Sequence, residues 1–142
     1  MITGGRTQAR DDVFALVKTV LETQNIEAIW QDDLEEHDVD VPAVSVSMYH
    51  FNGSQTSIGN ATGSTRWRQE GNVEVRIRFP VKNGGLTKAD DLTTMLENVF
   101  RSKSTPNGVW FRDVTGREVP PKDGNVRVEI TAQFTYQEVV NV

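Results

Sequence analysis

The sequence has no cysteine among its 142 residues. That absence excludes a disulfide framework, a thiolate metal site and a cysteine nucleophile. No apolar run approaches the ~18 residues of a membrane-spanning helix, and the first stretch shows no basic segment followed by an apolar one. We therefore expect neither a signal peptide nor contact with a membrane.

An excess of basic residues is also missing. The chain has 15 lysines and arginines against 20 aspartates and glutamates, for a net charge of −5. A protein of this charge does not wrap DNA by neutralising phosphates, although a local basic face stays open. With 37% hydrophobic and 25% charged residues, the composition fits one folded domain over residues 1–142.

Catalytic signatures are equally scarce. His37 and His50 are the only histidines, and no serine lies in a G-x-S-x-G motif. The glycines of Lys82–Leu86 lack the spacing of a phosphate-binding loop. The sequence therefore predicts a protein that is not an enzyme, with no catalytic residue, cofactor or metal site, and with both histidines as surface or strand residues.

The chain is organised around Arg66–Val81, where large apolar residues alternate with polar ones from Val73 to Phe79. A period of two predicts a strand with one buried face, and proline at position 80 ends it. Amphipathic helices are expected at 7–23 and 87–100, and further strands at 26–30, 43–51, 109–112 and 126–136, with turns over 113–125. This order predicts an α+β fold: a mostly antiparallel sheet with two amphipathic helices packed on one side.

Two segments are expected to be mobile. One is the polar lead of residues 1–6. The other is a loop over residues 52–65, which is nearly all Gly, Ser, Thr, Asn and Gln. Such a segment cannot bury enough surface to offset its ordering entropy, and loops of this length are often functional.

Two charged segments have opposite signs. The acidic one lacks the glycine and ligand spacing of a calcium loop, so we interpret it as a solvated loop or a contact surface. The arginines of the central strand share its polar register, if Gly71 keeps the phase; they either contact phosphates or pair with glutamates such as Glu70, Glu74 and Glu129. The acids are Asp32, Asp33, Glu35, Glu36 and Asp38, and the arginines are Arg66, Arg68, Arg76 and Arg78. Trp30, Trp67 and Trp110 are less certain core residues, and a tryptophan outside the core is often an interface anchor.

Several motifs follow one another along nearly the whole chain. After the first helix come IEAIWQ (Ile26–Gln31), a Pro-x-Val-x-Val strand start (Pro42–Val46), the Gly/Ser/Thr loop, RQEGNVEVRIRFPVKNGG (Arg68–Gly85), a helix over Ala89–Phe100 and a long closing strand over Val126–Tyr136. In this layout the chain resembles the small tail terminator (tail completion) proteins of long-tailed, non-contractile bacteriophages and of phage-like gene transfer agents. It departs from that pattern at Gln31, where asparagine is expected.

The resemblance implies a structural protein of the virion, located in the tail at the head–tail junction and assembled in the host cytoplasm. Such proteins form a ring, usually a homo-hexamer, on the last ring of the tail tube protein. The ring ends tube polymerisation and offers a surface to the head–tail connector, and genome DNA passes through its channel without sequence-specific binding. The resemblance makes the loop a candidate contact with the tube or a neighbouring subunit: Asn52, Gly53, Ser54, Gln55, Thr56, Ser57, Ile58 and Gly59.

We further hypothesise that the acidic segment of one subunit meets the arginines of the next, because a head-to-tail interface joins unlike patches and can close into a ring. Two other functions stay open. The protein is alternatively a head–tail joining (neck) connector, or a small nucleic-acid-binding module that uses its arginine-rich strand face.

Overall fold

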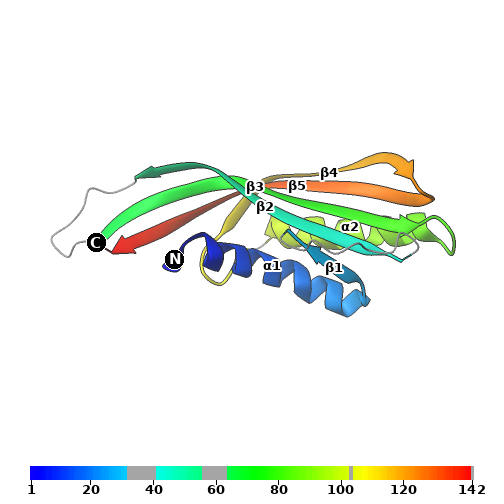
Figure 1. The fold of residues 1–142 in the computed structure, drawn as a ribbon, viewed down its shortest axis with the longest axis horizontal. Helices are drawn as coiled ribbons and strands as arrows, with labels where there is room; N and C mark the ends of the chain where they lie inside the picture. Colours follow the sequence, from blue (N-terminus) through cyan, green and yellow to red (C-terminus); the bar gives the residue numbers. More distant parts are fainter. Residues whose placement is uncertain (32–40, 56–63, 103, 142) are drawn as a thin grey trace.

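The computed structural model describes residues 1–31, 41–55, 64–102 and 104–141. In these ranges the chain forms two helices and a five-stranded, mostly antiparallel sheet, which confirms the predicted α+β fold (Figure 1). Both helices lie on the same side of the sheet, as expected. The paired ends of three strands extend beyond the helices, on the side where both chain ends lie.

The helices form where the sequence places apolar residues one turn apart. Helix α1 (Gly5–Gln24) buries Ala9, Val13, Val17 and Leu21 against the sheet, a spacing of four residues that keeps them on one face. It ends where Asn25 adopts a left-handed conformation, with φ of 53°, a common helix C-cap geometry. Helix α2 (Gly85–Ser102) similarly buries Ala89, Leu92, Leu96 and Phe100.

The sheet has the strand order β1-β2-β3-β5-β4. Its strands are β1 (Glu27–Trp30), β2 (Ala43–Gln55), β3 (Ser64–Pro80), β4 (Trp110–Lys122) and β5 (Asn125–Asn141). Only β1 and β2 pair in parallel, and β3 pairs with β5 in one unbroken register from Ser64 to Pro80. The stretch that organises the sequence is therefore the central strand of the sheet.

The core lies between the helices and one face of the sheet. Val73, Val75 and Ile77 of β3 are buried beside the inward residues of β2 and β5, as their alternation predicts. Aromatic side chains at four of the expected core positions are buried: Phe79, Phe100, Phe134 and Tyr136. Phe14 is only partly buried and stacks on Trp30, with the ring centroids 5.0 Å apart.

Three expectations from the sequence are wrong. Strand β2 continues through Asn52 to Gln55, into the predicted loop, because β3 provides a ladder for these polar residues. The predicted turn region after residue 112 is mostly strand β4, because an edge strand tolerates the prolines and bulges that we read as breakers. The polar lead is anchored, since Ile2 is fully buried and its backbone bonds to both Gln137 and Val139.

The glycine at position 71 does not bulge its own strand. The extra residue lies opposite it, at Phe51 of β2, where the register shifts between His50 and Asn52. A Cβ at Gly71 would clash with the backbone oxygen of Tyr49 and would lie 2.5 Å from Cζ of Phe134. The glycine is thus required for the close approach of β2 and of the Phe134 ring.

A candidate interaction surface on the open face of the sheet

The face of the sheet that carries no helix is polar and rich in arginine. We call it the open face, and define it by residues that the strand register places side by side in four rows: Ser45–Arg76–Glu129–Arg117, Ser47–Glu74–Thr131–Thr115, Tyr49–Asn72–Gln133–Arg112 and Asn52–Glu70–Thr135–Trp110. Beyond these rows, Arg66 and Arg68 continue the face at one end, and Arg78 and Arg127 continue it at the other.

The four arginines singled out from the sequence do share this face. The unbroken register between β3 and β5 keeps Arg66, Arg68, Arg76 and Arg78 in phase. What the sequence did not reveal is that Arg112, Arg117 and Arg127 join them from β4 and β5. Seven arginines and three glutamates therefore give the described part of this face an excess of four positive charges, although the whole chain carries −5.

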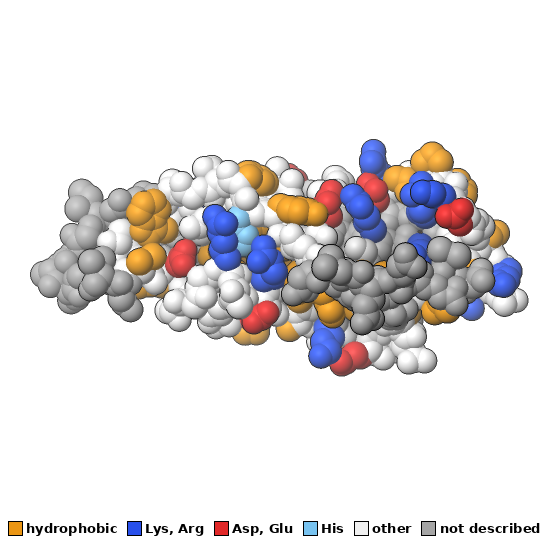
Figure 2. Space-filling view, viewed as in Figure 1, with side chains coloured by type: hydrophobic (Ala, Val, Ile, Leu, Met, Phe, Trp, Pro, Cys, Tyr) orange, Lys and Arg blue, Asp and Glu red, His pale blue; other side chains and the backbone are white. Residues whose placement is uncertain are grey.

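Most of these arginines have partners within the chain. Arg68 pairs with Glu70 at 2.8 Å, and Arg76 lies 3.8 Å from Glu74 and 3.7 Å from Glu129. Arg117 also reaches Glu129, at 3.0 Å. The two contacts to Glu129 join neighbouring strands, as expected, whereas those to Glu70 and Glu74 lie within β3. Figure 2 shows basic and acidic side chains intermixed at the upper right, over the sheet. Exposed pairs of this kind stabilise a fold by only about 0.2–1 kcal/mol each.

Two large aromatic side chains are exposed on the same face. Tyr49 of β2 is 49% exposed and Trp110 of β4 is 55% exposed, in neighbouring rows at opposite sides of the sheet. Trp110 lines a hollow of about 350 Å³ together with Arg68 and Arg112. Of the three tryptophans considered as interface anchors, Trp110 is thus the exposed one on the open face.

The other sequence candidates are distributed differently. The acids Asp32, Asp33, Glu35, Glu36 and Asp38 lie outside the described residues, as do the loop positions Thr56, Ser57, Ile58 and Gly59. Asn52, Gly53, Ser54 and Gln55 form the end of β2. There, Nδ2 of Asn52 donates to a carboxylate oxygen of Glu70 at 3.2 Å, so this part of the predicted loop belongs to the open face and to the sheet that carries it.

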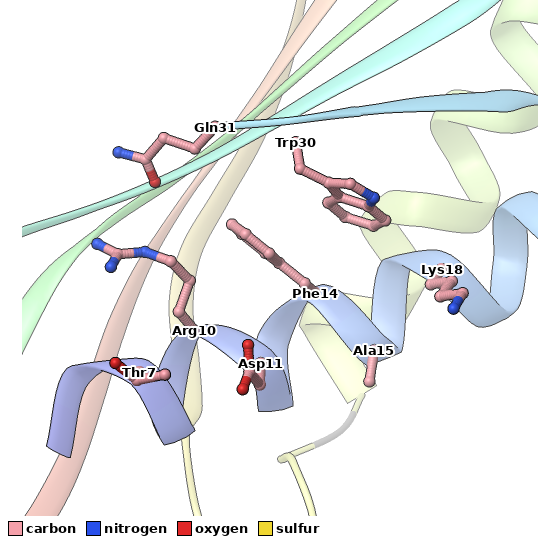
Figure 3. Close-up of a pocket in the computed structure, with 8 residues that line it drawn as sticks. All are labelled: Thr7, Arg10, Asp11, Phe14, Ala15, Lys18, Trp30 and Gln31. Carbon is pink, nitrogen blue, oxygen red and sulfur yellow. The ribbon is translucent and has the colours of Figure 1, made fainter. Parts of the chain in front are cut away.

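A groove of about 740 Å³ lies between α1 and β1 on the opposite side (Figure 3). Two of its residues close the β2 edge where β1 ends. Oε1 of Gln31 accepts a hydrogen bond from the Met48 amide at 2.9 Å, and Arg10 donates to the Met48 carbonyl at 3.1 Å. These two side chains thereby take the place of the backbone hydrogen bonds that β1 would make to Met48 if it continued. Gln31 therefore has a local structural role at this edge of the sheet.

His50, which is partly buried, forms a polar pair with the fully buried Tyr136. Nε2 of His50 lies 2.7 Å from the Tyr136 hydroxyl, and the imidazole packs edge-on against Phe134. Burial, helped by the charges of Arg6 and Arg10, lowers the pKa of His50 to about 4. Burial raises the pKa of Tyr136 to about 12. Both groups are neutral at pH 7, so they act as a polar contact within the packed strands.

Within residues 1–31, 41–55, 64–102 and 104–141, no cluster of three histidine, aspartate or glutamate side chains is arranged to hold a metal ion. Neither helix of the described chain is long and apolar enough to cross a membrane.

Comparison with known proteins supports the fold and no more. No protein-family model matches the chain, and no curated protein matches it in sequence. One similar solved structure, which carries no functional description, superposes with a TM-score of 0.63 at 15% identity. The match covers 93% of this chain and 95% of the other, so it extends over the whole domain. At this identity, the similarity establishes a shared architecture.

Proposed function

We propose that this protein is a tail terminator: a virion structural protein that forms a ring on the tail tube, ends tube polymerisation and offers a surface for head attachment. The proposal is supported by the family resemblance, whose motifs occupy β1, β2, β3, α2 and β5 of one domain. The observation that carries it is the open face. A broad sheet surface with arginine, tryptophan and tyrosine side chains has the composition typical of protein–protein interfaces.

In this proposal the partners are further copies of the chain, usually six in all, the tail tube protein and the head–tail connector. Subunits meet head to tail, so that the arginines of one contact acidic residues of the next, including the segment Asp32–Asp38. Arg68 and Arg76 bring their own glutamates to such a contact. A neighbouring carboxylate then joins an existing pair, and the arginine is already oriented to receive it.

The test is the mass of the purified protein in solution, combined with negative-stain images of the same sample. A six-fold ring with a central hole supports the proposal. If the protein is monomeric, purified tail tubes are added, because the tube end can be needed to assemble the ring. Failure to cap these tubes contradicts the proposal. If labelling instead places the protein on the head side of the junction, the protein is a neck connector.

One observation favours a second function. Tyr49 and Trp110 lie exposed on the same face as the arginines, and aromatic residues beside basic ones are how many proteins bind single-stranded nucleic acid. A nucleic-acid-binding module would bind an oligothymidine with an affinity that falls steeply with salt concentration. A terminator ring would pass DNA without retaining it.

A further inference from the structure

The positive charge of the molecule is concentrated on the open face. The open face carries an excess of four positive charges among its described residues, while the chain as a whole carries −5. The other described residues carry an excess of four negative charges, and the acidic segment Asp32–Asp38 lies outside the described residues. Seven of the ten arginines lie on one side of one sheet, and a second copy of the same chain, which is acidic outside this face, complements them in charge.

One end of this face, next to the edge strand β4, has the form of a docking point. Trp110 stands more than half exposed beside a hollow that Arg68 and Arg112 also line. Each arginine is held in place from within the chain, Arg68 by Glu70 at 2.8 Å and Arg112 by Oε1 of Gln133 at 3.0 Å. This hollow of about 350 Å³ has room for an aspartate or glutamate side chain, and its two arginines can pair with the carboxylate.

The arrangement of acids on the face favours a protein partner over nucleic acid. Glu70, Glu74 and Glu129 lie between the arginines and do not gather at the rim, so a phosphate backbone would meet carboxylates along its path. Protein interfaces, in contrast, commonly combine arginine, tryptophan and tyrosine with amide and hydroxyl side chains, as the rows of Asn72, Gln133 and Thr135 do here. The face thus fits a surface of mixed polarity with an acidic excess.

We infer that the part of the open face formed by Arg68, Trp110 and Arg112 is the surface on which a second copy of this chain docks an acidic side chain. This inference deepens the proposed ring and rests on it for the number of copies. It does not require the ring to be closed, because the same contact operates between two free subunits. Charge–charge contacts at an exposed interface weaken as salt screens them, so self-association declines with ionic strength.

The experiment is sedimentation equilibrium of the whole protein at low and high salt, for the wild type and three variants. The double variant Arg68→Glu/Arg112→Glu reverses both charges of the hollow, and Trp110→Ala removes the aromatic anchor without changing charge. The control is Lys18→Glu/Arg101→Glu, which makes the same change in net charge on the exposed helix surfaces. Thermal unfolding verifies that each variant is folded, which is expected because all five side chains are largely exposed.

The inference predicts that the open-face reversal weakens self-association about tenfold or more, a free-energy change of about 1.4 kcal/mol, while the control stays within about twofold of the wild type. Trp110→Ala weakens it as well. Equal self-association of the open-face reversal and the control overturns the inference. A wild-type protein that is monomeric up to about 0.5 mM also overturns the inference. The same holds if that monomer binds an oligothymidine through these arginines.

The two proposals fail separately. A dimer that is broken by the open-face reversal, in a protein that fails to cap purified tail tubes, supports the docking surface and contradicts the terminator. A six-fold ring that survives the reversal unchanged supports the terminator and overturns the docking surface.

Discussion

Gly71 provides a direct test of how the sheet is packed. Replacing it with alanine adds one methyl group, directed at the Tyr49 backbone oxygen and 2.5 Å from Cζ of Phe134. A flexible side chain can move away from such a contact, but the backbone of a paired strand cannot. Overpacking of a buried site typically costs about 1–3 kcal/mol. Alanine recovers about 0.5–1 kcal/mol, since glycine in a strand loses more entropy on folding.

Because the clash is with paired backbone, we take the upper end of that cost, and we expect Gly71→Ala to lower the free energy of unfolding by a net value of about 2 kcal/mol. For a domain of this size this is a fall in Tm of roughly 7 °C. Urea denaturation measures the first quantity and calorimetry the second. The matched control is Gly53→Ala on β2, two rungs along the β2–β3 ladder and on the same face of the sheet as Gly71. There the added methyl group meets only the flexible Gln69 side chain. The control is expected to lie within about 0.5 kcal/mol of the wild type. A Gly71→Ala protein as stable as the control would refute the described packing.

Three further substitutions test other parts of the structure. The folded pKa of His50 is about 4, below its ordinary 6.5, so its contribution to stability is complete above pH 6.5 and is lost as the pH falls toward 4. The full pKa shift corresponds to about 3 kcal/mol, which solvent screening at this partly buried site reduces to about 1–2 kcal/mol. Between pH 7 and pH 4.5, the free energy of unfolding of His50→Gln, measured with urea, should therefore fall by about 1–2 kcal/mol less than that of the wild type. An identical fall in both proteins would contradict the lowered pKa of His50. Gln31→Ala removes the acceptor for the Met48 amide and should cost about 1 kcal/mol, with faster hydrogen exchange at that amide; unchanged exchange would show that the bond is absent. Ile2→Ala should cost about 2–5 kcal/mol in urea denaturation because Ile2 is fully buried, whereas a mobile lead would give no measurable change.

Local patterns were sufficient for most of the fold. The alternation in β3 and the four-residue spacing in α1 depend only on side chains close in sequence, and each places its apolar residues against the core. The edges of the sheet depend on distant partners instead. Asn52–Gln55 is polar and reads as a loop, but it continues as strand because Gln69 and its neighbours on β3 provide the hydrogen bonds.

The open face was only partly predictable for the same reason. A period of two is enough to align the arginines of β3 with one another. Whether Arg112 and Arg117 of β4 share their face depends on a bulge between Arg112 and Thr115, and no local pattern marks it, because its effect is defined relative to β5. The Gln31 and Arg10 contacts to Met48 likewise join residues far apart in the sequence.

The central claim is that this protein ends the growth of a tail tube. The most direct measurement is the length distribution of tubes assembled from purified tail tube protein, with increasing amounts of this protein added and labelled for electron microscopy. The account predicts shorter tubes, each with the label at one end only. Tubes of unchanged length, with no label at either end, would contradict it.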